Sequence, residues 1–543
     1  MKQSSIIKIY IYCLGLFVLS SCNDMDPVPT SEYTDATFWQ SADNAEQVVN
    51  MAYNQMYSAD KMWNDEALSD NVFEGRTNTS QRVIRNGIAD PTLNRFADEW
   101  KDCYAGIKTC HIFLENIAKV PNMKEDLKNR RIAEIRFIRA YQYFRLVNFY
   151  GAVPFFTSDI TLEESKTVSR TSKDVILKFI HEELDDIMQI LPSKDGLPET
   201  DNGRITKGGA CAFQARAYLY ESNWDKVATY CDSLINNQAK FGKYELYPNY
   251  AELFTAAKEY NDEVILDYAY VPSLKIWSKF YGMAPISAGA FLNSLAPLQG
   301  LVDNYLLLNG KTIADASYND NAPYVNRDPR LAATVLFHGG EWTFFDGSKK
   351  NIYIKPGSAS TKEEKVDEYI SASSNSTSTG YYSKKYYDVT ATSTYESGLN
   401  IIMFRYADIL LMYAEAKFEL GQMNATIWDS TIKAIRQRAG FTNSTALNYP
   451  SLSNAEMRKT IRNERRSELA LEGLRYYDII RWKAGSEYLN GYVYGAKFVN
   501  ENKDYIRLDN RRFEESRDYL WSVPRAQIDL NSNLKPNNPG YAN

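Results

Sequence analysis

Residues 125–149 constrain the fold more than any other segment, because they predict a long helix that is apolar on two sides. Apolar residues recur at helical spacing along one side, namely Ile132, Ile135, Ile138, Tyr141, Phe144 and Val147. A second side is extended by Ala133, Phe137, Ala140 and Phe149. Such a helix must be wedged between neighbours and cannot simply lie on a surface. We expect it to stop at Gly151, with Pro154 beyond.

Helical hairpins are expected on both sides of the chain's midpoint. Residues 208–221 and 224–235 form one pair joined at Ser222-Asn223, and residues 404–420 and 426–439 form another. Small residues stand where the paired helices must approach, so both pairs look like degenerate, dispersed tetratricopeptide hairpins. Further helices are predicted over residues 41–57, 100–117 and 175–191.

Residues 241–399 have a different composition from the rest of the chain, rich in Gly, Pro, Ser, Thr and aromatic residues. A short β-like run covers residues 263–268, and the tract 371–380 (SASSNSTSTG) is predicted to be a flexible loop. Long irregular insertions on a rigid scaffold are where binding residues usually lie. We therefore expect this part to carry a ligand site.

The first 22 residues have the pattern of a bacterial lipoprotein signal. Lys2 and Lys8 flank the start of an apolar stretch over residues 9–19, and the string Leu-Ser-Ser-Cys ends at Cys22. The apolar run is too short to span a bilayer. We expect residues 1–21 to be a signal peptide that is removed, and Cys22 to be acylated as a lipid anchor.

The predicted fold class is mainly α, with a tetratricopeptide-like helical hairpin scaffold and a loop-rich, irregular ligand-binding part that contains short strands. Residues 22–32 are polar, acidic and proline-bearing, which predicts a lipidated tether. Residues 33–543 are expected to form a single body. Within it, residues 33–240 and 400–543 are the helical scaffold, and residues 241–399 supply the loop-rich insertions.

Composition and cysteine spacing exclude several kinds of site. The net charge of −6 argues against nucleic-acid binding, which needs a concentrated basic face. Cys103 and Cys110 stand too far apart for a disulfide within one helix, whereas Cys211 and Cys231 can either pair across a hairpin or stay free. With no CxxC motif, no metal is predicted, and no cofactor is predicted either.

An acidic column is the one feature that invites an enzymatic interpretation. Glu464, Glu468 and Glu472 are spaced four apart on a predicted helix, and paired carboxylates are what glycoside hydrolysis requires. Arginines crowd the same segment: Arg462, Arg465, Arg466, Arg475 and Arg481. We interpret Glu464, Glu468, Arg475 and Arg405 as structural ion-pair residues. No nucleophile motif or phosphate loop is present, so no catalytic residue is assigned.

Several strings together resemble the SusD/RagB family of outer-membrane nutrient-binding lipoproteins. They lie in family order behind the lipobox, over residues 134–156, 326–331, 404–416, 461–482 and 519–541. The resemblance implies a helical scaffold of four tetratricopeptide-like hairpins. It also implies a cell-surface protein, lipid-anchored in the outer membrane, that sits as a lid on a SusC-like TonB-dependent transporter. Asp24 and Asp26 after Cys22 loosely resemble the export signal of such lipoproteins.

The resemblance also points to two regions for the ligand. Sugar rings present C–H faces to flat aromatic rings, while amide, carboxylate and guanidinium groups fix their hydroxyls. The first region, residues 63–82, also holds Phe73 and Asn78, and the second is residues 275–291. The candidate ligand-binding residues are Trp63, Asp70, Asn71, Arg76, Trp277, Tyr281 and, with a weaker claim, Trp342. The alternative for each aromatic residue is loop-anchoring packing.

The predicted function is non-catalytic capture of oligosaccharide or polysaccharide and its delivery to the transporter. Three alternatives stay open: peptide capture for the same type of transporter, a purely structural lid, and a surface glycosidase. The acidic column gives the last one its only support, and the surrounding arginines weaken it.

Overall fold

The computed structural model describes residues 35–290, 293–371, 375–391, 395–498 and 504–543 of the 543-residue chain. The predicted signal peptide, the acylated Cys22 and the tether lie outside these residues. Within the described ranges no helix combines the length and apolarity needed to cross a membrane.

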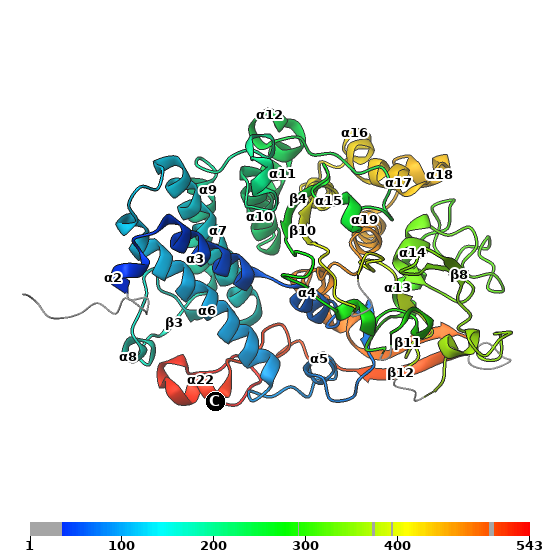
Figure 1. Ribbon diagram of the computed structural model, residues 1–543. Helices are drawn as coiled ribbons and strands as arrows, with labels where there is room; N and C mark the ends of the chain where they lie inside the picture. Colours follow the sequence, from blue (N-terminus) through cyan, green and yellow to red (C-terminus); the bar gives the residue numbers. More distant parts are fainter. Residues whose placement is uncertain (1–34, 291–292, 372–374, 392–394, 499–503) are drawn as a thin grey trace, which may run out of the picture.

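Helix α7 (Glu125–Tyr150) is wedged between other helices, as its two apolar sides predict. It packs against α6 (Asn94–Asn116), α9 (Lys173–Ile187) and α3 (Ala42–Met56), and Figure 1 shows these helices together on one side of the molecule. The helix ends where Gly151 takes a positive φ of 70°. Its burial between neighbours makes it the centre of the helical half.

The hairpin expected over residues 208–235 is confirmed. Helix α10 (Lys207–Tyr220) packs on α11 (Trp224–Asn236), and the connection turns at Ser222, which has a φ of +58°. The side chain of Asn223 then caps α11 by accepting the backbone N–H of Lys226. Helix α11 also packs against α15 (Tyr406–Glu419), which joins the two halves of the scaffold.

The second hairpin differs from its prediction at both ends. Phe404 and Arg405 do not begin a helix, because they belong to strand β10 (Ile401–Arg405), which pairs antiparallel with β4 (Val264–Tyr268). The β-branched and aromatic side chains of this run favour a strand once a distant partner is available. The second helix is also interrupted, since a π-helical turn over Asp429–Lys433 separates its two α-helical parts.

Most of the remaining elements are short, and the six sheets found among the described residues each have two antiparallel strands. The other helices are α2 (Asp35–Phe38), α4 (Ala59–Glu66), α5 (Ser80–Arg85), α8 (Leu162–Ser165), α12 (Gln238–Phe241), α13 (Gln299–Asn304), α14 (Pro329–Thr334), α16 (Ala425–Trp428), α17 (Ala434–Ala439), α18 (Ser444–Leu447), α19 (Asn454–Glu468), α20 (Arg475–Arg481), α21 (Gly485–Tyr488) and α22 (Arg525–Leu530). The other strands are β1 (Val72–Glu74), β2 (Val153–Pro154), β3 (Arg170–Thr171), β5 (Leu295–Pro297), β6 (Val335–Leu336), β7 (Glu341–Thr343), β8 (Lys349–Asn351), β9 (Tyr382–Ser383), β11 (Gly491–Lys497) and β12 (Tyr505–Arg511). The mainly α fold class with short strands is confirmed.

A buried network of charges, centred on Arg405, joins the two parts of the fold. The Arg405 guanidinium donates to Glu263 at 2.7 Å, to Glu468 at 2.6 Å and to both carboxylate oxygens of Glu472 at 2.7 and 2.8 Å. Glu263 directly precedes β4, whereas Glu468 ends α19. Only 1% of the Arg405 side chain is exposed, so these carboxylates replace the water that it loses.

The predicted acidic column is broken at its end. Helix α19 stops at Glu468, and Leu471 and Gly473 have positive φ angles of 63° and 75°, so Glu472 lies on the turn that follows. That turn still returns Glu472 to the same network. Glu464 stays on the helix and pairs with Arg330 at 2.8 Å.

Opposite charges decide the protonation of Glu468. Burial alone would raise the pKa of this carboxyl, but the guanidiniums of Arg438, Arg405 and Arg330 lower it well below its usual range. The carboxylate is therefore held ionised inside the protein, and each partner depends on the others for its stability there.

A second charge cluster fixes the segment after α4. Both carboxylate oxygens of Asp70 accept from the Arg475 guanidinium, at 2.8 and 3.1 Å, and Arg466 lies 2.9 Å away. Burial alone would raise the pKa of Asp70, but Arg466 and Arg475 lower it to about 2. This pairing ties the Asp70 segment to α19 and α20.

The buried network predicts a large cost for removing one charge. Glu468→Gln should lower the free energy of unfolding by about 3 kcal/mol, because it leaves buried guanidiniums without their counter-charge. Denaturation in urea measures this loss. Glu163→Gln is the matched control, since Glu163 is 80% exposed and pairs only with Lys166 at the surface. Equal losses of unfolding free energy in Glu468→Gln and Glu163→Gln would contradict the interpretation of Glu468 as part of a buried ion-pair network.

The Asp70 pairing predicts an acid-dependent contribution to stability. Its folded-state pKa lies below the unfolded value, so the contribution is complete above about pH 4 and is lost as the pH falls towards about 2. Asp70→Asn should therefore cost on the order of 2 kcal/mol at pH 6 and much less at pH 2.5. Urea denaturation at both values tests this. The control Asp529→Asn, at an exposed residue, should change the free energy of unfolding little at either pH. An equal loss at both pH values for Asp70→Asn would contradict the link between the Asp70 pKa and stability.

Candidate ligand-binding site

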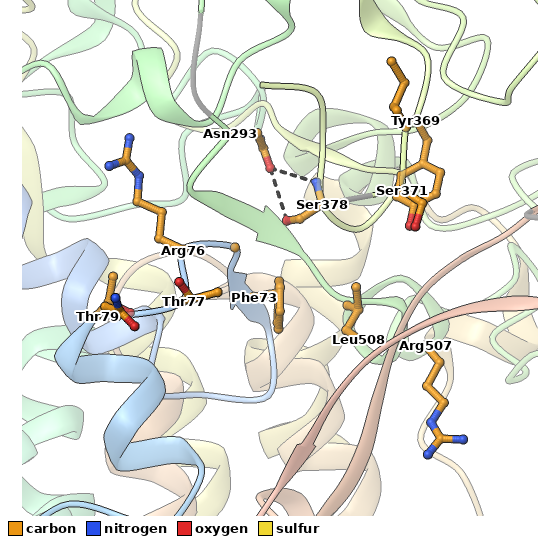
Figure 2. Close-up of a pocket in the computed structure, with 13 residues that line it drawn as sticks. Phe73, Arg76, Thr77, Thr79, Asn293, Tyr369, Ser371, Ser378, Arg507 and Leu508 are labelled. Carbon is orange, nitrogen blue, oxygen red and sulfur yellow. Dashed lines mark hydrogen bonds between the residues drawn. The ribbon is translucent and has the colours of Figure 1, made fainter. Parts of the chain in front are cut away.

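An open pocket of about 920 Å³ lies where four distant segments meet (Figure 2). Its walls come from the segment after β1, the segment before β5, the loop around residue 370 and strand β12. The lining comprises Phe73, residues 75–79, Asn293, residues 369–371, Ser378 and residues 507–508. A volume of this size suits a ligand of several rings.

Strand pairing and close backbone approach build the pocket. Strand β1 pairs with β5 so that Phe73 faces Ala296, and the Gly75 N–H then donates to the Ser294 carbonyl at 3.0 Å. A Cβ atom on Gly75 would lie 3.0 Å from the Ser378 hydroxyl, so a larger residue would crowd this junction. The segments are thereby held in contact without a regular sheet.

Asn293 stands at this junction with half of its amide group used. Its Oδ1 accepts from the backbone N–H and the hydroxyl of Ser378, at 3.2 and 3.4 Å. The Asn293 residue is 5% exposed, and its Nδ2 has no hydrogen-bond partner among the described residues. A buried amide donor without a partner is costly, so this group is available to a ligand oxygen.

The other lining groups combine flat rings with small polar side chains. Phe73 forms the floor and is 5% exposed, while the half-buried Tyr369 offers a ring on the wall. Hydroxyl and amide groups come from Thr77, Asn78 and the neighbouring serines and threonines. The charged lining residues are arginines, and no carboxylate belongs to the lining within the part of the chain that the structure describes.

The first predicted region contributes only in part. Arg76 lines the pocket, and so do Phe73 and Asn78. Asn71 is fully buried, where it donates to Glu66 at 2.8 Å and accepts from Arg466. The paired Asp70 does not line the pocket either.

All three candidate indoles are buried in the structure. Trp63 is 0% exposed, Trp342 is 1% and Trp277 is 7%, and the Trp277 indole donates to the Leu399 carbonyl at 2.7 Å. Tyr281 lies away from the pocket, with its ring 6.2 Å from that of Tyr395. These aromatic residues anchor the loops, which was the alternative for each of them.

The sequence did not reveal the far walls of the pocket. Tyr369, Asn293 and Arg507 come from segments hundreds of residues away from the first loop. One signal was present, because Tyr369 precedes the serine- and threonine-rich tract at 371–380. That tract was expected to be flexible, yet Thr377 is fully buried, and its hydroxyl accepts the N–H groups of three following residues.

Metal-binding and disulfide chemistry find little support in the described ranges. No group of three or more His, Cys, Asp or Glu side chains there is arranged to hold a metal ion. Cys103, Cys110, Cys211 and Cys231 are free and buried. Burial raises the pKa of all four thiols well above the ordinary value.

Comparisons with known proteins agree with the family resemblance of the sequence. A family model described as the SusD family matches residues 263–541, and a second, described as "Starch-binding associating with outer membrane", matches residues 25–219. SusD-like protein P25 of Formosa agariphila is 28% identical over 515 residues, covering 88% of this chain and 89% of the relative. The starch-binding protein SusD of Bacteroides thetaiotaomicron is 28% identical over 145 residues, or 25% of this chain and 24% of its own.

Solved structures extend the similarity to the fold. A SusD-like carbohydrate binding protein from Bacteroides fragilis superposes with a TM-score of 0.82 at 27% identity, covering 92% of this chain and all of the other. A second SusD-like protein from the same organism gives a TM-score of 0.79 at 26% identity, covering 94% and 99%. Since the SusD family model alone spans just over half of the sequence, this chain belongs to the SusD/RagB family.

Proposed function

We propose that this protein captures oligosaccharide or polysaccharide at the cell surface and delivers it to a SusC-like TonB-dependent transporter, without catalysing a reaction. The observation that carries the proposal is the pocket itself. It combines an unpartnered buried amide on Asn293, a ring on Tyr369 and several hydroxyl groups in about 920 Å³. This is the mixture of flat apolar surface and fixed polar groups that sugars require.

The arrangement of carboxyl groups supports binding over hydrolysis. A glycosidase needs two carboxyl groups beside the scissile bond. The described lining of the pocket supplies none, and Glu464 and Glu468 are bound to buried arginines, such as Arg330. Oligosaccharide turnover by the intact protein that disappears in Glu468→Gln would contradict this part of the proposal.

Location and partner rest on the family and on the N-terminal pattern. One matching family model is described as associating with the outer membrane, which agrees with the lipobox that ends at Cys22. We infer that acylation of Cys22 holds the protein at the outer face of that membrane. The transporter partner follows from the family resemblance. Peptide capture for the same transporter is the alternative, and the hydroxyl-rich lining favours sugars over it.

Removing the Tyr369 ring from the wall of the pocket should lower the affinity for glycans. Tyr369→Ala should weaken glycan binding about tenfold, which is the loss of about 1.4 kcal/mol of stacking. Affinity electrophoresis against a polysaccharide panel measures it. Tyr449→Ala is the matched control, because Tyr449 is 39% exposed and does not line the pocket. The site assignment fails if both variants migrate like the wild type in a gel that retards the wild type.

The Asn293 amide predicts a second, separable effect. Asn293→Ala should weaken binding about fivefold, the worth of one neutral hydrogen bond. Ser378→Ala removes the hydroxyl contact to Asn293 but keeps the amide donor, so it should weaken binding less. Isothermal titration with a glycan from the panel compares the two. A larger loss in Ser378→Ala would show that loop geometry, and not the donor, determines affinity.

A further inference from the structure

Two exposed arginines line the pocket without an acidic partner. Neither Arg76 nor Arg507 forms an ion pair with any described residue, although most arginines of this chain pair with carboxylates. Figure 2 shows them at opposite sides of the pocket, with Phe73 between them. Both side chains extend outward from Phe73 in this view, so one guanidinium lies at each edge of the pocket and not at its centre.

Arg507 is held in a geometry that leaves its hydrogen-bond donors available. Its guanidinium carbon lies 3.6 Å from the centre of the Tyr492 ring, on the neighbouring strand β11. Stacking occupies the flat face of a guanidinium, whereas its N–H groups point outward along the edge. That edge matches the two oxygens of a carboxylate or a sulfate.

Further positive charge lies beneath the pocket floor. Arg85 and Arg511 are buried, and their guanidiniums donate to main-chain carbonyls, both of them to Val72. Neither forms an ion pair among the described residues. Burial, with a smaller contribution from nearby Arg466, lowers the pKa of Arg511 to about 10 against the attraction of Asp70 and Asp509. The charge here is only partly compensated.

The acidic residues two positions from each arginine, Glu74 and Asp509, are already engaged. Asp509 accepts from Arg82 at 3.1 Å and from Asn86 at 3.2 Å. Glu74 is 7% exposed and accepts the backbone N–H of Arg76 at 3.4 Å. Burial raises the pKa of Glu74, which weakens it as a counter-ion. The two lining arginines are thus left for a ligand.

We propose that the pocket takes an anionic glycan, with a carboxylate or sulfate group on Arg76 and a second one on Arg507. This inference rests on the proposed function and names the class of sugar that the site selects. Two cations on opposite sides of one pocket match an extended chain with more than one acidic group. The net charge of −6 repels such a chain from the rest of the surface, so local charge gives selectivity.

Titration calorimetry of the intact mature protein tests the charge preference. The probes are polygalacturonate oligomers, which carry only carboxylates, carrageenan oligomers, which carry only sulfates, and neutral starch oligomers. At 50 mM NaCl we expect at least one acidic probe to bind tenfold or more tightly than the neutral one, and to weaken at 300 mM NaCl. The two acidic probes distinguish a carboxylate ligand from a sulfate ligand.

Variants place the charge preference in the pocket. Arg76→Gln and Arg507→Gln should each weaken the acidic probe about tenfold and weaken the neutral probe much less. Arg525→Gln is the matched control, since Arg525 is exposed on α22 and outside the pocket. Thermal melting should be unchanged in all three, because each side chain is at the surface.

The outcomes separate this inference from the proposed function. Neutral oligomers that bind as tightly as the acidic ones overturn the charge preference and leave glycan capture standing. Acidic binding that survives in both pocket variants, or is lost equally in Arg525→Gln, also overturns it. Failure of all three probes to bind counts against the anionic preference, and if the wider polysaccharide panel fails as well, glycan capture falls with it.

Discussion

The ion pairs of the Arg405 guanidinium hold the helical scaffold and the loop-rich part of this protein together. Arg405 stands at the end of β10 and binds Glu263, Glu468 and Glu472, so strand, helix and turn share one buried ion. A buried charge that loses one partner is strongly destabilising, whereas a complete set is tolerated. The network is therefore complete only when the loop-rich segments and the helical scaffold meet at Arg405.

The same logic extends from the core to the ligand pocket. Asp70 binds Arg475, and the buried Arg511 donates to the carbonyl of Val72, at the start of the strand that carries Phe73. The floor of the pocket is thus fixed by charged side chains that do not belong to its lining. The rim, by contrast, carries polar groups that are left open. Because the floor is already rigid and the polar groups of the rim are open, such a site can orient a ligand without the entropy cost of ordering its own side chains first.

How much the sequence predicts depends on the range of the interactions involved. The helix over residues 125–149 is recovered almost to the residue, because its signal is local and repeats over many turns. Phe404 is misassigned because its strand partner lies far away in the chain. The burial of Trp63 is equally invisible, since it depends on which loops cover it. Arg76 lines the pocket, but the opposite wall, including Tyr369, is assembled by tertiary contacts alone.

The four buried thiols have a consequence for the chemical stability of this protein. A thiol reacts with oxidants and disulfides as its thiolate, and burial both removes access and keeps Cys103, Cys110, Cys211 and Cys231 protonated. No cysteine of the described body is cross-linked, and none of these four thiols is open to oxidants. They should therefore stay reduced in oxidising surroundings, and the protein should need no reducing agent during purification.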